Sequence, residues 1–300
     1  MRSFDVIVLG SINIDIVMRV RQFPAAGETV VARALGRHPG GKGANQAIAA
    51  ARAGAAVAMI GAVGDDADGI EMREVLERSG VDCRSVRKVP GAATGSAYIL
   101  VDDEGQNQIV VSGGANLSVE LPPTEQAAIY LCQLESPLDV VAAFLQSRPR
   151  GAIGILNAAP FRPGSSSLFA SADIVILNET ELTGYAGVAE MDLVDGQVVD
   201  LARSLLTHED QHIVVTLGSA GSIDVTQADF TRTHAERAEV VDTTGAGDCF
   251  CGYLAASLAQ GQNWARSLAI AHRAAGLAVG KAGAISAIPT VTELLSGRAR

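Results

Sequence analysis

Hydrophobic residues follow a strand-and-helix rhythm along most of this chain. Residues 5–10 (DVIVLG) form a short apolar run that ends in glycine, as is typical of a buried strand. Similar runs recur between stretches long enough for helices, at residues 57–60, 128–132, 152–156, 173–177 and 212–217. Strands that alternate with helices predict a mostly parallel sheet with helices on its faces.

Composition and glycines mark the helices of this pattern. The Ala-rich residues 43–54 and the amphipathic residues 67–80 predict two helices in the N-terminal half. Two more are predicted from about Gly245 and Trp264, after strands near residues 221–225 and 232–240. Ligands bind such sheets beyond the carboxyl ends of the strands, so polar residues there are candidates for a site.

Two blocks interrupt the rhythm with an alternation of apolar and polar residues. Residues 14–35 are one block, and residues 96–112 are the other, with a hairpin signal at Asp103-Glu104-Gly105. We interpret them as a small β lid beside the main sheet, with segments at about 14–39 and 94–112 of one domain that covers residues 1–300. Two such blocks cannot bury both their faces in a monomer, and their exposed edges favour a homodimer formed through the lid.

Composition narrows the class of protein. The net charge of −10 and the absence of a long basic run argue against nucleic acid as a main partner. No apolar run reaches the roughly 20 residues of a membrane span, and the N-terminus lacks the pattern of a signal peptide. The four cysteines form no CxxC pair. We expect a cytoplasmic protein that contacts neither membrane nor nucleic acid.

The motif with the clearest chemistry is Asp242-Thr-Thr-Gly-Ala-Gly-Asp248. It is predicted to lie between a strand at residues 238–241 and an apolar helix at residues 249–259. Gly245 and Gly247 allow several backbone N–H groups to converge at the helix N-terminus, where the helix dipole favours an anion. Asp248, an acid in the first turn of this helix, is either a catalytic base beside the anion hole or an ordinary N-cap residue.

Two N-terminal motifs suit a polyhydroxylated ligand. Residues 40–45 (GGKGAN) resemble a phosphate-binding P-loop, but Gly43 stands where Ser or Thr should hold Mg²⁺, so we reject that reading. Amide and ammonium groups of such a loop can bind vicinal hydroxyls instead. Asn13 and Asp15 share a face if their segment is extended, and the alternative is a capped turn.

Other polar clusters follow predicted strands. Glu135, residues 178–181 (NETE) and residues 216–221 (TLGSAG) all fall at carboxyl ends, where sites form. Residues 208–212 match the HExxH pattern of zinc proteases, but the preceding helix is predicted to end near Leu206, so its two histidines cannot share a helical face. His272 lies on a predicted helix near the C-terminus and by itself indicates only a core or surface histidine.

These motifs together, in this order, are similar to those of the PfkB-type carbohydrate kinases, over nearly the whole chain. GSINID, GGKGANQA, QLESP and a histidine near the C-terminus most resemble the ribokinases among them. The resemblance implies a ribokinase-like α/β fold with a lid. It also implies transfer of the γ-phosphoryl group of ATP to the 5-hydroxyl of a pentose, D-ribose above all, with Mg²⁺ and with K⁺ as activator.

The resemblance also assigns roles to residues. Asp248 corresponds to the catalytic base, beside an anion hole of Gly245, Ala246 and Gly247. Positions matching the sugar site are Asn13, Ile14, Asp15, Gly41, Lys42, Gly43, Ala44, Asn45 and Glu135. Those matching the nucleotide side are Asn178, Thr216, Leu217, Gly218, Ser219, Ala220, Gly221, Gly247 and His272, with Glu181 on Mg²⁺ through water. A monovalent-cation loop would comprise Asp242, Thr244, Ala278, Lys281, Gly283 and Ala287.

Departures and alternatives remain. Tyr98 stands in the lid where ribokinases often carry an aliphatic residue, and Ala220 replaces a larger one in the TLGSxG turn. A PfkB-type kinase acting on a nucleoside, a deoxypentose or a ketohexose is the main alternative. A catalytically silent sugar-binding protein is another, although it would have no need of Asp248. No GxGxxG follows the first strand, which argues against a Rossmann dehydrogenase.

Overall fold

The computed structural model describes residues 3–122, 126–189 and 193–296. In this part of the chain the larger sheet has ten strands, ordered β14-β13-β12-β11-β10-β9-β1-β4-β5 with β6 paired to β4. All pairs are parallel except β12–β13 and β13–β14. The strands are β1 (Ser3–Leu9), β4 (Val57–Gly64), β5 (Val81–Asp82), β6 (Val86–Val89), β9 (Gln126–Cys132), β10 (Ile153–Asn157), β11 (Ile174–Asn178), β12 (His212–Thr216), β13 (Ser222–Val225) and β14 (Phe230–Thr233).

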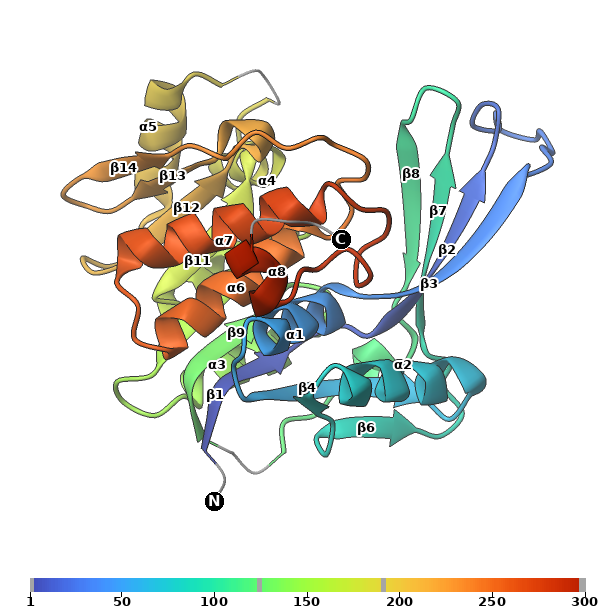
Figure 1. Ribbon diagram of the computed structural model, residues 1–300, viewed down its shortest axis with the longest axis horizontal. Helices are drawn as coiled ribbons and strands as arrows, with labels where there is room; N and C mark the ends of the chain where they lie inside the picture. Colours follow the sequence, from blue (N-terminus) through green and yellow to red (C-terminus); the bar gives the residue numbers. More distant parts are fainter. Residues whose placement is uncertain (1–2, 123–125, 190–192, 297–300) are drawn as a thin grey trace.

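Helices cover both faces of this sheet (Figure 1). One face packs on α1 (Lys42–Arg52), α2 (Ala67–Arg78), α6 (Ala246–Ala259), α7 (Trp264–Ala278) and α8 (Val291–Ser296), and the other on α3 (Leu138–Gln146), α4 (Glu179–Ala186) and α5 (Asp195–Leu205). Successive strand residues point to opposite faces, so Val6 and Val8 lie in the first core and Ile7 and Leu9 in the second. The predicted α/β fold with a mostly parallel sheet is confirmed.

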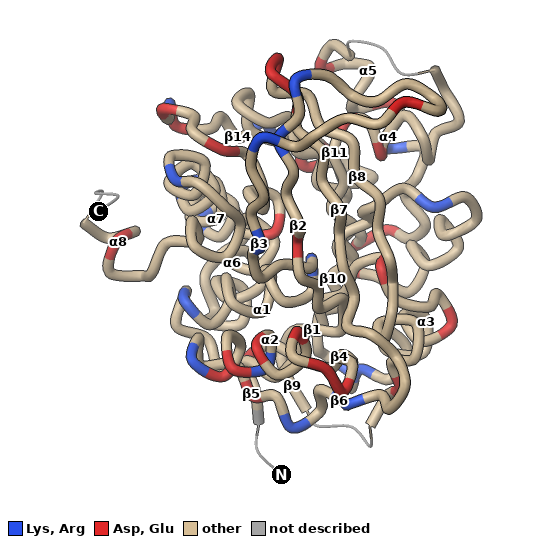
Figure 2. Tube along the Cα trace, turned by 90° about the vertical axis from the view of Figure 1, so that its right-hand side faces the viewer, with Lys and Arg blue, Asp and Glu red and all other residues tan. Residues whose placement is uncertain are grey.

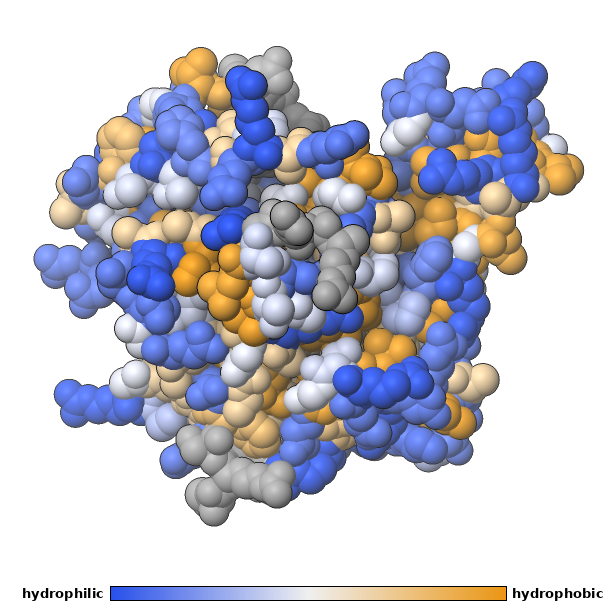
Figure 3. All heavy atoms as spheres, viewed as in Figure 1, coloured by the Kyte–Doolittle hydropathy of each residue, from blue (hydrophilic) through white to orange (hydrophobic). Residues whose placement is uncertain are grey.

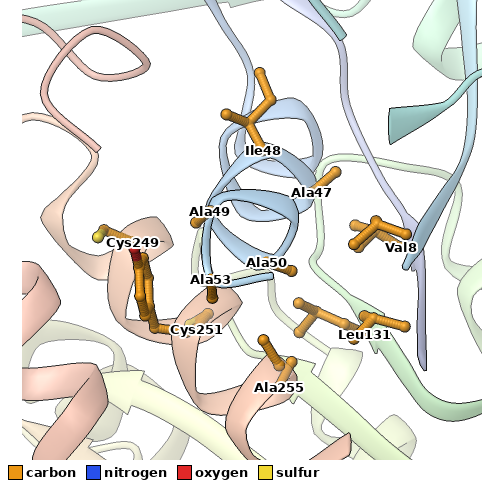
Figure 4. Packing of buried hydrophobic residues seen from close by; sticks show 14 of the residues in the cluster. Val8, Ala47, Ile48, Ala49, Ala50, Ala53, Leu131, Cys249, Cys251 and Ala255 are labelled. Carbon is orange, nitrogen blue, oxygen red and sulfur yellow. The ribbon is translucent and has the colours of Figure 1, made fainter. Parts of the chain in front are cut away.

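Helices α1 and α6 approach each other closely because small side chains line their contact. Figure 4 shows alanines of α1, Cys251 and Ala255 of α6, and Leu131 of the sheet in this core. A Cβ atom added at Gly252 would lie 2.5 Å from the Cβ of Ala49, so glycine is required there. This close packing brings the N-terminal turns of both helices to the same edge of the sheet.

The small sheet, here called the lid, has the order β3-β2-β7-β8 and stands apart from the helices in Figure 1. Its strands are β2 (Asn13–Arg19), β3 (Ala34–Gly40), β7 (Gly95–Val101) and β8 (Asn107–Ser112). Strands β7 and β8 form the hairpin predicted around Asp103-Glu104-Gly105. Several hydrophobic side chains on it are exposed, among them Leu35, Tyr98, Ile109, Val110 and Val111.

The strand predicted at residues 232–240 is wrong in most of its length. Strand β14 ends at Thr233, because β13, its partner among the described residues, begins at Ser222 and pairs no further. Residues 234–241 form no strand, and Val240 and Val241 are exposed. The backbone N–H groups of Val241 and Asp242 donate instead to the carbonyl of Val279. The DTTGAGD motif therefore follows a loop, not the strand predicted at residues 238–241.

The zinc-protease pattern at residues 208–212 lies outside any helix. This agrees with the prediction from its sequence context. Helix α5 ends at Leu205, and His212 begins β12. The His212 ring faces Asp224 at 3.0 Å, while Nε2 of His208 lies 3.1 Å from the Ala172 carbonyl oxygen. The two histidines thus serve separate structural contacts.

Within the described residues, no helix has the length and apolar character to cross a membrane.

Candidate active site

The candidate site lies where the lid meets the carboxyl edge of the larger sheet. Figure 2, viewed from the lid side, shows β2, β3, β7 and β8 in front of α1, α6 and β10. Strands β2 and β7 pair in parallel from Asn13 and Gly95 onward, so both lid segments begin at this edge. The motifs that follow β1, β9, β11 and β12 all lie at this edge, because these strands run parallel.

Asp248 occupies the first turn of α6. The turn before it uses Gly245 in the left-handed region (φ 75°), and a Cβ there would lie 2.9 Å from the Cβ of Ala284. A Cβ at Gly247 would meet no protein atom within 4 Å, which leaves open space beside the helix N-terminus. The N–H of Ala246 donates to the Thr243 carbonyl at 3.2 Å, so that donor is engaged within the turn.

Two amides hold the Asp248 carboxylate. Nδ2 of Asn45 donates to Oδ2, and Nε2 of Gln46 donates to Oδ1, each at 2.8 Å. Burial raises the pKa of Asp248, while Lys42 and the two amide hydrogen bonds oppose this rise. The result is a buried carboxylate beside a helix N-terminus, with no side-chain cap bond to the helix itself. The structure thus does not show the N-cap alternative.

Lys42 is the central cation of the site. Its Nζ lies 3.6 Å from Glu135, which also accepts a hydrogen bond from the hydroxyl of Ser11. Burial lowers the pKa of Lys42, but the nearby carboxylates of Asp248, Glu135 and Glu181 outweigh burial and raise it overall. Because these acids converge on one ammonium, Lys42 remains charged and limits their mutual repulsion.

Asp15 extends this acidic cluster to the lid. Burial raises its pKa from the ordinary 3.8 to about 6, with further contributions from Glu135 and Asp248 and an opposing one from Lys42. A Cβ at Gly40 would lie 2.1 Å from Oδ2 of Asp15, so glycine on the neighbouring strand makes room for the carboxylate. Asn13 and Asp15 both lie on the extended strand β2, two residues apart, as predicted.

Two buried amides, Asn13 and Asn45, lie in this region, and one of them has an unpaired acceptor. Nδ2 of Asn116, in the 3-10 turn Gly114–Ser118, donates to Oδ1 of Asn13 at 2.7 Å, which turns the NH₂ group of Asn13 the other way. Oδ1 of Asn45 is buried and has no hydrogen-bond partner among the described residues. A buried unpaired acceptor of this kind suits a ligand hydroxyl that supplies the missing hydrogen bond.

The NETE motif forms a capping box at the start of α4. Oδ1 of Asn178 accepts from the N–H of Glu181 at 2.8 Å, and Oε2 of Glu181 accepts from the N–H of Asn178 at 2.9 Å. Burial raises the pKa of Glu181, opposed by its backbone hydrogen bond and by Lys42. The motif therefore stabilises a helix and also brings an acid to the Lys42 cluster.

The TLGSAG motif joins β12 to β13 through a short 3-10 turn at Gly218–Ala220. Gly221 has φ 99°, and a Cβ there would lie 2.0 Å from the Thr233 carbonyl oxygen, so only glycine fits. His272 contacts Ser222, the residue that follows this turn. Its Nε2 is 2.7 Å from Oγ of Ser222, its ring packs on Phe250, and burial lowers its pKa to about 4. It is a neutral, buried histidine at neutral pH.

Asp242 connects the DTTGAGD turn with the segment after α7. Oδ1 accepts from the N–H of Thr244 at 2.9 Å, and Oδ2 accepts from the N–H of Gly283 at 2.9 Å. These hydrogen bonds lower the pKa of Asp242 despite partial burial. Of the other predicted loop residues, Ala278 accepts from the Lys281 N–H, and Ala287 donates to Ala284. The structure thus places both halves of the predicted cation loop in direct contact.

Several site residues have no counterpart in the sequence predictions. Gln46 directly follows the predicted Asn45, and Gln133 lies two residues before Glu135, so proximity to motifs is a signal for both. Asn116 and Asn157 carry no such signal, because their partners lie 103 and 111 residues away in the sequence. Only the fold brings these amides to the site.

Comparison with known proteins agrees with this geometry. The model of the pfkB family carbohydrate kinases matches residues 3–291. A ribokinase of Schizosaccharomyces pombe is 35% identical (97% of this chain and 96% of the relative), and a deoxyribokinase of Salmonella typhi is 35% identical (84% of each). The structure of Arabidopsis thaliana ribokinase complexed with ribose and ATP superimposes with a TM-score of 0.87 at 31% identity (98% of each chain). With a family match over almost its whole length and a site built from its motifs, the chain belongs to the pfkB family of carbohydrate kinases.

Proposed function

We propose that this enzyme transfers the γ-phosphoryl group of ATP to the 5-hydroxyl of D-ribose and releases D-ribose 5-phosphate and ADP. The observation that carries the proposal is Asp248, a buried carboxylate held by two amides at the N-terminus of α6, beside the polar cluster of Lys42, Glu135 and Asp15. Ribokinases of several organisms are about 35% identical over nearly the whole chain, which supports ribose as the acceptor.

In this mechanism Asp248 takes the proton of the sugar hydroxyl while the oxygen attacks the γ-phosphorus and ADP leaves. Phosphoryl transfer depends mainly on positioning and charge stabilisation. The N–H groups at the start of α6, with open space beside Gly247, are suited to stabilise the transferring group. The lid excludes water, which limits hydrolysis of ATP.

Mg²⁺ would neutralise phosphate charge when bound with ATP. Glu181 fits this role because its buried carboxylate is fixed by the capping box and lies near Lys42, so it can orient a metal-bound water. Asn178 is fixed by the same box. We place both residues, with Thr216–Gly221 and His272, on the nucleotide side, and the enzyme itself in the cytoplasm.

The test of the proposed function is ADP formation over a panel of acceptors at fixed ATP. We expect D-ribose to give the highest kcat/KM. Deoxyribose is the second candidate, because a deoxyribokinase is also 35% identical, over 84% of this chain. The panel includes a ketohexose and nucleosides, and a nucleoside as best acceptor would contradict the proposal. Sugar-independent ADP formation at the same rate would contradict it too.

Ribose affinity should depend on pH through Asp15. The pKa of this group is about 6 in the free protein, and only its ionised form accepts two hydroxyl hydrogen bonds. Ribose binding therefore favours the carboxylate, lowers its pKa and releases a proton near pH 6. We expect affinity to rise between pH 5 and pH 7. Calorimetry in two buffers of different ionisation enthalpy measures the proton release, and proton uptake near pH 6 would contradict this prediction.

We also propose activation by K⁺ at the loop formed by Asp242, Thr244 and residues 278–287. Asp242 joins both segments directly, and Gly283 has the left-handed backbone of a tight turn (φ 85°). Carbonyl and carboxylate oxygens suit a weakly hydrated monovalent ion. An ion here would hold the turn that carries the N-terminus of α6, three residues after Asp242.

The ion is tested by replacing K⁺ with tetramethylammonium at constant ionic strength. We expect kcat or the affinity for ATP to fall, because the loop before α6 loses its support, while ribose affinity is kept. Constant ionic strength removes salt screening as an explanation. Equal activity in both salts would remove the ion site and leave the kinase assignment untouched.

We further propose that two lids pair to form a homodimer. Apolar side chains gather on the lid in Figure 3. Leu35, Tyr98 and Val110 share one face of its sheet and are 72%, 42% and 68% exposed. A second lid would cover them. Val110→Lys should shift the mass in light scattering from dimer to monomer. Ile70→Lys, on α2 and 50% exposed, is the matched control and should remain dimeric. A monomeric wild type at micromolar concentration would contradict the proposal.

A further inference from the structure

A chain of buried amides lies behind Asp248. Nε2 of Gln46 donates to Oδ1 of Asp248 at 2.8 Å and to Oδ1 of Asn157 at 3.0 Å. Nε2 of Gln133 in turn donates to Oε1 of Gln46 at 2.6 Å. Gln46 and Gln133 are both 0% exposed. Two fully buried glutamines in succession, ending on the carboxylate of the base, call for a functional explanation.

The contacts of Gln46 fix its amide in one orientation. Both N–H groups point to acceptors, and the carbonyl oxygen faces a donor, so all three polar contacts agree with one orientation. A rotated amide would place its oxygen against Asp248 and Asn157 and its NH₂ against Gln133. Asn157 is fixed in the same manner, because its Nδ2 donates to the Ile176 carbonyl at 3.2 Å and its Oδ1 must then face Gln46.

Gln133 lies between the ends of two central strands, and its buried Oε1 has no hydrogen-bond partner among the described residues. It directly follows β9, and a Cβ at Gly10, just after β1, would lie 2.0 Å from Oε1 of Gln133. Glycine at position 10 therefore leaves the space that the Gln133 amide occupies. The chain of contacts therefore runs from the residue just after β9, through Gln46, to the carboxylate.

We propose that Gln46 is a positioning residue that fixes the rotation of the Asp248 carboxylate, and that Gln133 acts through Gln46. The proposal rests on Asp248 being the base of the proposed function. With one amide on each oxygen, a second acceptor direction of the carboxylate is left to take the proton of the sugar hydroxyl. The donors are neutral, so they orient the base without neutralising it as a cation would.

The charged groups around Asp248 act on its proton affinity and not on its rotation. They are Lys42 on α1, Glu135 after β9, Asp15 on the lid strand β2 and Glu181 on α4. Their fields persist when Gln46 is replaced by a neutral residue. The hydrogen bond from Gln46 is one of the contacts that lower the pKa of Asp248, so its removal should raise this pKa.

The decisive variant is Gln46→Met, which keeps the length of the side chain and removes its donors. We expect kcat to fall roughly 10²-fold, the loss typical of a misplaced catalytic group. We also expect the acidic limb of the kcat/KM profile to move to higher pH, with the KM for ATP unchanged. A merely structural role would not move the acidic limb. An unchanged acidic limb with kcat close to wild type would overturn the proposal.

The relay is tested by Gln133→Met and by the double variant. Gln133→Met should shift the acidic limb in the same direction by a smaller amount, because Gln46 can then rotate. In the Gln46→Met background, Gln133→Met should change kcat by less than about twofold, the limit of ordinary additivity. If Gln133→Met lowers kcat in the Gln46→Met background as much as it does in the wild-type background, the idea that Gln133 acts through Gln46 is overturned. If Gln46→Met fails to fold, the shift in Gln133→Met alone decides the proposal.

Gln211→Met is the matched control. Gln211 is also 0% exposed and donates to the carbonyls of Phe169 and Ala172, away from the site. Its replacement should lower the melting temperature and leave the pH profile as in wild type. A shifted pH profile in Gln211→Met would overturn our interpretation of the shift in Gln46→Met. Failure of the proposed function itself looks different, because wild type would then lack ribose-dependent ADP formation or Asp248→Asn would keep it.

Discussion

Asp248→Asn is expected to lower kcat by about 10²–10⁴-fold, the usual contribution of a positioned acid or base. Asparagine has nearly the same shape, but its neutral amide cannot take the proton of the sugar hydroxyl. The fold and most of the ligand binding should persist, since the N-terminus of α6 and the pairing of Lys42 with Glu135 are kept. The measurement is steady-state ADP formation together with calorimetric titration of ribose and of a non-hydrolysable ATP analogue.

Asp224→Asn is the control for this variant. Asp224 is a buried aspartate that accepts from the indole N–H of Trp264 at 2.6 Å and faces His212, the first residue of β12. It therefore lies toward the opposite end of the sheet from the site. Its replacement should lower stability and keep kcat. Turnover close to wild type in Asp248→Asn would remove Asp248 from the mechanism.

The fold was predictable because its signals are local. The apolar runs at residues 5–10 and 212–217 give β1 and β12 within one or two residues, since a buried parallel strand must be apolar on both faces. The strand predicted at residues 232–240 failed because apolar alternation does not reveal whether a partner strand is present. Val240 and Val241 keep the apolar pattern of a strand, but no strand among the described residues pairs with them.

The site was predictable only where one segment carries the chemistry. Gly245, Gly247 and Asp248 act within one turn, so their spacing already predicts an acid beside a helix N-terminus. The partners that orient Asp248 are not predictable in this way. Asn45 and Gln46 lie more than 200 residues away, and their contact depends on the close packing of α1 on α6 that Gly252 permits.

The arrangement of charge explains how a chain with a net charge of −10 can bind a triphosphate. Asp15, Glu135, Glu181 and Asp248 act on one another and on Lys42, so these side chains carry more negative than positive charge. Sugar hydroxyls can donate to these carboxylates without adding charge. The phosphates instead depend on backbone N–H groups and on Mg²⁺. Sugar and nucleotide should therefore respond differently to the loss of a carboxylate.

Asp15→Ala is expected to weaken ribose binding by roughly 10²–10⁴-fold and to leave the affinity for the ATP analogue nearly unchanged. A carboxylate that accepts two sugar hydroxyls makes two charge-assisted hydrogen bonds of about 1.5–3 kcal/mol each. Asp15 is suited to this role because Gly40 leaves room for it and because it lies on the lid strand β2, near Glu135 and Asp248. Calorimetric titration of each ligand measures both affinities.

Stability separates this binding role from a structural one. The pKa of Asp15 is about 6 in the folded protein and 3.8 in its ordinary state, so the folded state holds the proton more tightly. The ionised group therefore costs stability as the pH rises from about 4 through 6, and that cost remains at pH 7.5. Asp15→Ala should then melt no earlier than wild type at pH 7.5. The control is Asp103→Ala at the tip of the lid hairpin, whose carboxylate pairs only with the exposed Arg33 among the described residues and should leave both affinities unchanged. Equal losses of ribose and nucleotide affinity in Asp15→Ala, with a lower melting temperature, would show that Asp15 supports the lid and does not bind the sugar.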